Sequence, residues 1–178
     1  MNILLHSCCA PCTNQCVEVL RQTGSAPTLF WFNHNIHPFQ EYKARRNALR
    51  SYAQVCGAPL IEADTYGLRD FLPQAMENID GRCYSCYEVR LDETARQAAE
   101  QGFNGFTSSL LISPYQNHGL ICDLANEAAE RHKVAFVYHD FRPHFRTGQQ
   151  VARDMELYMQ KYCGCIFSEE ERYVKKKK

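Results

Sequence analysis

Ten cysteines occur in a chain of 178 residues, and seven of them fall into three tight groups. The groups are Cys8-Cys9 with Cys12, Cys83 with Cys86, and Cys163 with Cys165. A C-x-x-C spacing lets two thiolates converge on one metal ion or cluster, because a tight turn or first helical turn points both side chains the same way. Three such groups in one chain predict a metal site assembled from distant segments.

The spacing alone does not separate a zinc site from an iron–sulfur cluster, since both are held by cysteine thiolates. A third interpretation is a thiol–disulfide enzyme, because Cys163 and Cys165 are close enough in sequence to form a strained disulfide. The three remaining cysteines, Cys16, Cys56 and Cys122, lie at apolar positions of expected helices. We expect them to act as small buried hydrophobic residues.

The overall composition is that of an ordinary globular protein, with 45% hydrophobic and 22% charged residues. The formal net charge is zero, so a nucleic-acid partner would need a local basic face. The N-terminus does not read as a signal peptide, and no apolar run approaches the roughly 20 residues that span a bilayer. We therefore expect a cytoplasmic protein with no membrane partner, in which clustered cysteines serve metal or redox chemistry.

Short apolar segments alternate with amphipathic ones along the chain. The expected strands are 2–7, 28–33, 59–63, 105–112 and 134–139, and the expected helices are 13–23, 41–55, 67–77, 87–101, 117–132 and 147–161. Most of these strands are apolar on both faces, which favours a parallel sheet covered by helices. We expect one α/β catalytic domain over residues 1–174, followed by a disordered basic tail at 175–178.

Ligands of parallel sheets gather at the carboxyl ends of the strands. Cys8-Cys9 follow the first expected strand, Asn33-His34 the second, Ser113 the fourth and Asp140 the fifth. The sequence therefore predicts that these residues lie along one edge of the sheet.

Six segments of the chain resemble the cobalamin-independent epoxyqueuosine reductase family. They are LLHSCCAPC at 4–12, NIHPFQEYKAR at 35–45, GRCYSCYEVRLDETA at 81–95, FTSSLLISPYQNH at 106–118, DFRP at 140–143 and YMQKYCGCIFS at 158–168. The resemblance implies a Rossmann-like fold similar to adenine-nucleotide pyrophosphatase (HUP-type) folds. It also implies a two-electron reduction of epoxyqueuosine to queuosine at the wobble position of tRNA.

The resemblance further implies a 4Fe-4S cluster and an additional mononuclear iron. The implied cluster ligands are Cys8, Cys9, Cys83 and Cys86, and the implied redox-active disulfide joins Cys163 and Cys165. Candidate ligands of the additional iron are Cys12, Cys163, Cys165 and Asp140.

The chemistry of such a reduction constrains the remaining parts. No amino-acid side chain is a low-potential electron donor, so a cofactor and an unidentified external electron donor must supply the two electrons. The leaving oxygen needs a Lewis acid or a proton donor. Asp140 is the favoured proton donor because it follows a strand, and His34, His37, His139 and Tyr115 are weaker candidates.

RNA recognition would use cations and aromatic rings. The candidate phosphate contacts are Lys43, Arg45, Arg46, Arg50, Arg82, Arg90, Arg142 and Arg146, and the candidate stacking residues are Phe39, Tyr42, Tyr84 and Tyr87. We expect most of the arginines to lie on solvated helix faces. Arg82 and Arg142 are exceptions because they flank the cysteine and DFRP motifs.

Three other functions compete with the reductase. An ATP-dependent tRNA-modifying enzyme would carry a glycine-rich phosphate loop after the first strand, where this chain reads HSCCAPC. A zinc-stabilised RNA-binding module would hold zinc without iron. A dithiol oxidoreductase would work without Cys83 and Cys86.

Overall fold

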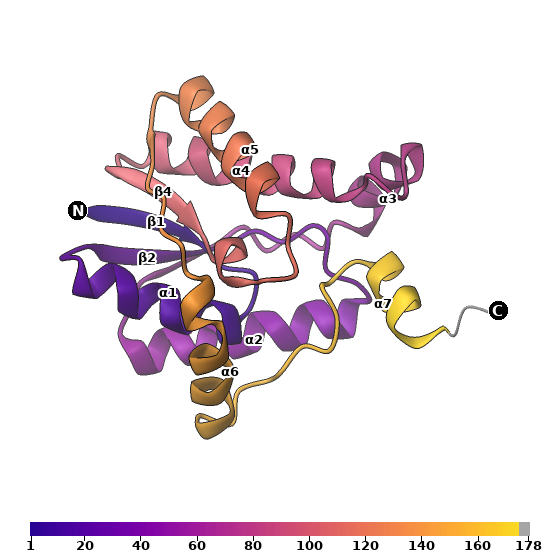
Figure 1. Cartoon of the computed structure of the whole chain (residues 1–178), viewed down its shortest axis with the longest axis horizontal. Coiled ribbons are helices and arrows are strands. Elements are labelled where there is room, and N and C mark those ends of the chain that lie inside the picture. The colour runs from indigo at the N-terminus through magenta and orange to yellow at the C-terminus, as the bar shows by residue number, and fades with distance from the viewer. Residues whose placement is uncertain (175–178) are drawn as a thin grey trace.

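The computed structural model describes residues 1–174, which form a five-stranded sheet covered by helices (Figure 1). The strands are β1 (Asn2–His6), β2 (Ala26–Trp31), β3 (Leu60–Glu62), β4 (Gly105–Ser108) and β5 (Ala135–Phe136). They are ordered β3-β2-β1-β4-β5, and each neighbouring pair is parallel. The succession of strands reverses between β1 and β4. Strands β1 to β3 follow one another toward one edge of the sheet, and β4 and β5 toward the other edge.

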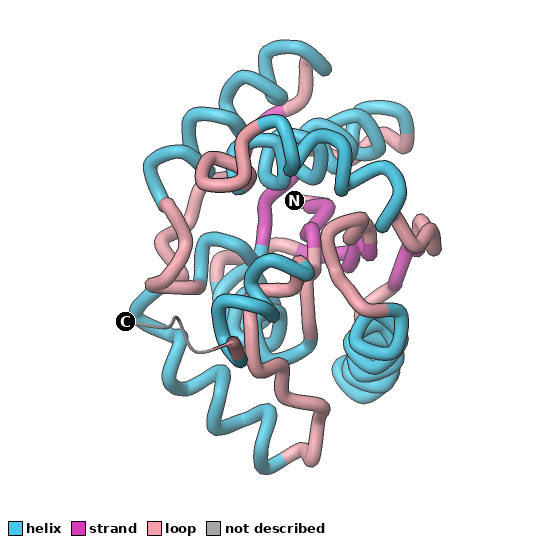
Figure 2. Tube along the Cα trace, turned by 90° about the vertical axis from the view of Figure 1, so that its right-hand side faces the viewer, coloured by secondary structure: helices cyan, strands magenta, loops and turns pink. Residues whose placement is uncertain are grey.

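Helices cover both faces of this sheet. Helices α1 (Ala10–Gln22), α2 (Phe39–Cys56) and α6 (Phe145–Asp154) lie on one face, and α4 (Cys83–Glu100) and α5 (His118–His132) on the other (Figure 1). Figure 2, turned by 90°, shows the strands between these two helical layers. The central strands are mostly apolar, with Leu4, Leu5 and Phe30 almost fully buried, because neither face meets water. The predicted Rossmann-like α/β fold with helices on both faces is confirmed.

Two short helices lie beyond the carboxyl ends of the strands, on the right in Figure 1. Helix α3 (Leu68–Glu77) precedes α4, and α7 (Ile166–Tyr173) ends the described chain. The sequence predicted α3 but not α7. Both helices therefore lie at the end of the sheet where ligands gather in parallel folds.

Several predicted boundaries are wrong. The strand expected over 105–112 ends at Ser108, because the Ser108 side chain accepts a hydrogen bond from the Leu110 amide and starts a 3-10 turn at Ser109–Ile112. The strand expected over 134–139 shortens to Ala135–Phe136. The helix expected over 147–161 ends at Asp154, so residues 155–165 cross the molecule without forming a helix.

The fourth predicted helix starts earlier than expected, at Cys83 instead of residue 87. Cys83 and Cys86 consequently lie in its first turn, three residues apart and on the same side of the helix. The expected tail at 175–178 lies outside the described residues. Among residues 1–174, no helix is long and apolar enough to cross a membrane.

Candidate functional site

The candidate site lies where the strand order reverses, at the carboxyl ends of β1 and β4. The Cys8 amide donates to Ser109 Oγ across 3.1 Å, and His6 Nδ1 lies 2.9 Å from Ser108 Oγ. Asn33 Nδ2, after β2, donates to the carbonyl of Ser7 across 3.0 Å. The prediction that residues following β1 and β2 lie along one edge is confirmed, and this switch point is where ligands bind in open α/β sheets.

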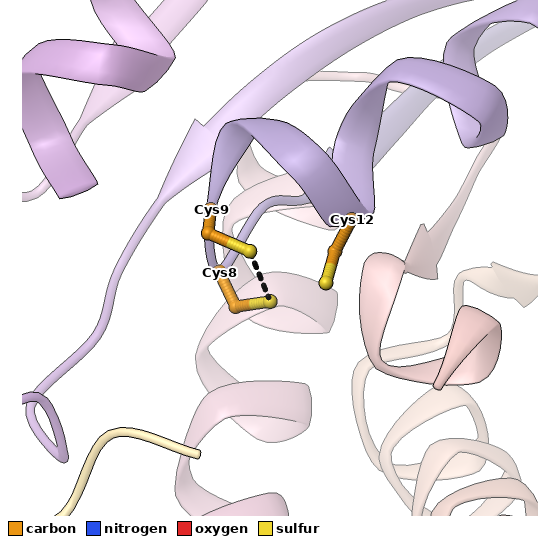
Figure 3. A group of neighbouring side chains, drawn as sticks. All are labelled: Cys8, Cys9 and Cys12. Carbon is orange, nitrogen blue, oxygen red and sulfur yellow. Dashed lines mark hydrogen bonds between the residues drawn. The ribbon is translucent and has the colours of Figure 1, made fainter. Parts of the chain in front are cut away.

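Three cysteines converge at the start of α1. The Sγ atoms of Cys8, Cys9 and Cys12 all lie within 4.8 Å of one another, and those of Cys8 and Cys9 are 3.7 Å apart (Figure 3). Helix α1 begins at Ala10 with Cys9 as its N-cap, so Cys9 and Cys12 stand one turn apart on the same side. We call these three residues the sulfur triad.

The sulfur triad can hold negative charge even without a bound ion. Hydrogen bonds from Cys12 and Cys9 lower the pKa of Cys8 well below the usual value for a thiol. Burial raises the pKa of Cys9, and the hydrogen bond to Cys8 raises that of Cys12. The three thiols therefore differ in acidity, and a bound metal ion would displace their protons.

Four more cysteines form a second sulfur group, composed of Cys83 and Cys86 from α4 and Cys163 and Cys165 from the segment before α7. Cys86 and Cys165 pack in one small apolar cluster with Phe71 of α3. Burial raises the pKa of Cys86 to about 12 and also raises that of Cys83, with further contributions from the neighbouring thiols of this group. Cys163 and Cys165 are free thiols here, so the predicted disulfide stays a prediction.

The four predicted cluster ligands do not form one group of neighbouring sulfurs in the structure. Cys8 and Cys9 meet Cys12, whereas Cys83 and Cys86 lie outside the triad. Within residues 1–174, the triad is the one group of three or more potential ligands whose donor atoms lie within 4.8 Å of one another. The four-cysteine ligand set therefore stays a prediction. The CCxxC motif also contains Cys12, and its spacing was the signal that could have added this residue to the set.

A cavity of about 510 Å³ joins the two sulfur groups. Its wall includes Cys8 and Cys12 of the triad and Cys163 of the second group. Pockets that bind small molecules usually fall between about 300 and 1,000 Å³. The cavity is thus large enough for one nucleoside-sized ligand that would touch both groups of thiols.

The cavity wall carries four cations and, among the described residues, no carboxylate. The cations are Arg45, Arg90, Lys161 and Arg172. The whole chain is formally neutral, so this concentration of positive charge is local. Low-dielectric walls focus such a field and favour an anionic occupant, such as metal-bound thiolates or phosphate.

Two of these arginines are buried, each with 1% of its surface exposed. Arg45 forms an ion pair with Glu41 across 2.7 Å and donates to the carbonyls of Cys163 and Tyr162 across 2.7 and 3.0 Å. It thereby ties the segment that carries Cys163 to helix α2. The expectation of a solvated helix face is wrong for Arg45, because three partners compensate its burial.

Arg90 is buried without an acidic partner among residues 1–174. It donates to the Cys86 carbonyl across 2.9 Å and to Cys86 Sγ across 3.0 Å. The expectation of a solvated helix face is wrong here too. An uncompensated buried guanidinium is costly, and thiolates at these sulfurs would supply the missing negative charge.

The other predicted RNA contacts are mostly engaged elsewhere. Ion pairs join Arg46 to Asp64, Arg50 to Glu62, Arg82 to Glu171 and Arg142 to Asp140. Tyr42 and Tyr87 are buried, so the prediction that they stack on RNA bases is wrong, whereas Phe39 and Tyr84 are exposed.

Of the predicted proton donors, Tyr115 lines the cavity, whereas Asp140 and the three histidines do not. Asp140 is exposed, and its pair with Arg142 lowers the pKa of the carboxyl to about 2, so it carries no proton at neutral pH. Burial lowers the pKa of His34 to about 3 and that of His37 to about 4, which leaves both neutral. His139 packs against Phe141, with ring centroids 5.6 Å apart. The catalytic role of Asp140 stays a prediction.

Sequence reasoning missed residues of the segment that precedes α7. Gln160 Nε2 donates to Cys9 Sγ across 2.9 Å and lies 3.5 Å from Cys12 Sγ. Lys161 lines the cavity beside it, and so does Arg172 from the last turn of α7. No local pattern marks these residues, since Gln160 and Lys161 were expected to end an ordinary helix and α7 was not predicted. Both segments reach the cavity only through the tertiary fold.

Fold and site together define an α/β protein with converging cysteines that could hold a metal at the switch point of a parallel sheet. The donor set fits a thiolate-bound metal centre, because the sulfurs of Cys8, Cys9 and Cys12 already converge. The buried Arg90 donates a hydrogen bond to a fourth sulfur, that of Cys86. The family model described as "Epoxyqueuosine reductase QueH" matches residues 3–171. The chain belongs to this family, which confirms that it is an oxidoreductase.

Curated relatives support the same assignment. A protein of Dehalococcoides mccartyi named epoxyqueuosine reductase QueH is 38% identical over 173 residues, covering 97% of this chain and 95% of the relative. Proteins of the same name from Acinetobacter baylyi and Histophilus somni are 35% and 34% identical, each over 93% of this chain and over 79% and 71% of the relative.

A solved structure shares the fold. It is a predicted subunit of tRNA methyltransferase from Methanocaldococcus jannaschii, with a TM-score of 0.55 at 14% identity, over 86% of this chain and 76% of that chain. This likeness concerns the arrangement of strands and helices alone.

Proposed function

We propose that this protein reduces epoxyqueuosine to queuosine in tRNA. In this reaction both carbon–oxygen bonds of the epoxide break, two electrons and two protons enter, and an alkene and water leave. An external low-potential electron carrier supplies the electrons. The observation that carries the proposal is the cation-lined cavity, whose wall exposes thiols of both sulfur groups to one nucleoside-sized space.

The proposed cofactor is a 4Fe-4S cluster held by Cys8, Cys9, Cys83 and Cys86. When bound, such a cluster supplies electrons at low potential, one at a time. Cys8 and Cys9 already converge, and Cys83 and Cys86 share one helical turn. A four-iron cluster holds its thiolates further apart than a single ion does, so a distance between the two pairs is compatible with this set.

The residues beside the proposed cluster would hold it in place. Gln160 donates to Cys9 Sγ, and Arg90 donates to Cys86 Sγ. Hydrogen bonds of this kind stabilise thiolates and orient metal ligands. An additional iron is part of the proposal, with Cys12 and Cys163 as the candidate ligands that line the cavity.

Cys163 and Cys165 are the proposed second electron store. Oxidation of this dithiol to a disulfide releases two electrons and two protons, which matches the requirement of the epoxide. Gly164 between them adopts a φ of 153°, and its carbonyl accepts a hydrogen bond from the His37 amide across 2.8 Å. This contact, with the bonds from Arg45, holds Cys163 on the cavity wall.

The cavity also indicates the state of the substrate. A space of about 510 Å³ accepts one nucleoside but not a stacked duplex. The reacting nucleotide must therefore leave its stack, which costs least in a single-stranded loop such as the anticodon. Ser109, Ser113 and Gln149 line the space and offer hydrogen bonds to the base and the ribose.

A zinc-stabilised RNA-binding module is the second candidate, favoured by the closeness of the three triad sulfurs. Purification without oxygen, with iron, zinc and acid-labile sulfide quantified, separates the two. The reductase hypothesis predicts iron and sulfide. It also predicts that incubation with a strong reductant and epoxyqueuosine-containing tRNA removes the mass of one oxygen atom. Zinc without iron, or an unchanged tRNA mass with a loaded cluster, would contradict it.

Cysteine variants test the ligand set within the same preparation. Cys83→Ser should lose iron and activity if Cys83 is a ligand. Cys56→Ser is the matched control, because Cys56 is half-buried at the end of α2, outside both sulfur groups. A Cys83 variant that keeps its iron while Cys12→Ser loses it would replace the proposed set with one built on the triad.

A further inference from the structure

Three exposed residues of the cavity wall are together called the cavity mouth: Tyr115, Lys161 and Arg172. All three line the cavity whose inner wall holds Cys8 and Cys12. Tyr115 follows the 3-10 turn after β4, Lys161 belongs to the segment before α7, and Arg172 lies in the last turn of α7. The mouth is therefore a product of the tertiary fold.

Tyr115 is unusual because 85% of its surface is exposed although it belongs to the wall of a cavity. Its ring meets Phe145 edge to face, with centroids 5.8 Å apart, and its backbone amide lies 3.3 Å from Ser113 Oγ. These contacts hold the residue in place while leaving most of the ring uncovered. An exposed aromatic ring of this kind offers a stacking platform for an unpaired base.

Lys161 and Arg172 differ from Arg45, the cation of the same wall that pairs with Glu41 across 2.7 Å. Neither Lys161 nor Arg172 has an acidic group within 4.0 Å in the described part of the chain, and both side chains are exposed. Their charge is therefore available to an anionic partner at the mouth.

We propose that the cavity mouth binds single-stranded RNA on either side of the nucleotide that enters the cavity. Tyr115 stacks on a neighbouring base, and Lys161 and Arg172 contact phosphates of the backbone. This inference rests on the proposed function, since it places the anticodon loop around the same cavity. It assigns recognition to residues that make no contact with the thiols.

Stacking and phosphate contact make different demands, which the structure meets with different side chains. Stacking tolerates any base, since every base has a π-face. A cation that binds a phosphate releases counterions from the RNA. Added salt opposes this release and therefore weakens the contact. The proposal thus predicts RNA binding that is tolerant of sequence around the modified base and strongly dependent on salt.

The test measures binding of a fluorescent anticodon stem-loop with unmodified guanosine at the wobble position to the metal-loaded protein. Tyr115→Ala should weaken the Kd by about 5- to 150-fold, the range for loss of one stacked base. Tyr115→Phe keeps the ring and should bind like the wild type. Tyr138→Ala is the matched control, because Tyr138 is also exposed but lies outside the cavity wall.

Charge is tested by the salt dependence of the same binding. Lys161→Gln should reduce the slope of log K against log salt by about 0.7, the share of one phosphate contact on a single strand. Lys133→Gln is the control, since Lys133 is exposed and precedes β5 at the opposite end of the sheet. Equal slopes for Lys161→Gln and the wild type would overturn the phosphate contact.

Two outcomes would overturn the inference as a whole: Tyr115→Ala binding the stem-loop as tightly as the wild type, or an acidic peptide competing for the mouth better than RNA. Turnover separates this failure from failure of the proposed function. If the wild-type protein binds the stem-loop but leaves epoxyqueuosine unchanged, the proposed reduction is wrong and RNA binding by the cavity mouth is retained. If Tyr115→Ala has wild-type binding and KM while deoxygenation proceeds, RNA binding by the cavity mouth is wrong and the proposed reduction is retained.

Discussion

Replacing each buried arginine of the cavity by methionine should have opposite effects on stability. Arg45 and Arg90 are both 1% exposed and both lie on helices that line the same space. They differ in their partners, because Arg45 forms an ion pair with Glu41 and donates to two backbone carbonyls, whereas the hydrogen bonds of Arg90 go to Cys86. Methionine keeps much of the length of arginine without its charge.

Arg45→Met leaves the Glu41 carboxylate buried without its cation. Removing one partner of a buried ion pair costs about 3–5 kcal/mol, because the remaining charge is uncompensated. The variant also frees the carbonyls of Tyr162 and Cys163, which lose their donor. We expect the free energy of unfolding of the metal-free protein to fall by about 3–5 kcal/mol.

Arg90→Met removes a cation that has no acidic partner among the described residues. Replacing buried charge by an apolar side chain of similar size is often neutral or stabilising by about 1–4 kcal/mol. We therefore expect the metal-free variant to be as stable as the wild type or more stable. In the metal-loaded protein the bond to Cys86 Sγ is charge-assisted and contributes about 1.5–3 kcal/mol, so the variant should release iron to a chelator more readily.

Urea unfolding of the metal-free proteins, kept reduced and followed by circular dichroism, measures both effects. The slope m should stay unchanged, so that a shift of the midpoint reports stability alone. If Arg90→Met costs as much as Arg45→Met, Arg90 is a structural tie of α4 and its burial says nothing about charge on the sulfurs. Unchanged iron retention in Arg90→Met would refute its role beside the metal.

Three further outcomes follow from the site. The pKa values of about 3 for His34 and about 4 for His37 lie below the value of about 6.5 in unfolded chains. The unfolded state therefore binds more protons as the pH falls below about 6.5, so these two histidines together should cost about 3–4 kcal/mol of unfolding free energy between pH 7 and 5. His6, whose pKa burial lowers to about 4, adds to this loss. Urea unfolding should show a smaller loss in His34→Gln. Asp140→Asn should keep turnover within about twofold, since an exposed ion pair contributes little, and a loss of 100-fold would restore its predicted catalytic role. Gly164→Ala should cost about 1–3 kcal/mol, because a positive φ of 153° strains any other residue, and a wild-type midpoint would contradict that reasoning.

The amino-acid sequence by itself determined the layered fold and the local parts of the site. Apolar runs separated by amphipathic helices specify a parallel sheet, because strands buried on both faces need no alternation. The spacing of Cys9 and Cys12, and of Cys83 and Cys86, places each pair on one side of a helical turn. Such patterns act over a few residues, so they are legible without the rest of the molecule.

Only the tertiary structure decided which local parts meet and which charges are buried. The contact of Gln160 with Cys9 and the approach of Lys161 to the cavity join segments of very different sequence position. Arg90 looks like any helical arginine in the sequence, yet packing places it beside Cys86 with no acid near it. The physical reason is that burial and the partners of a charge depend on the whole set of packed elements, which no single segment encodes.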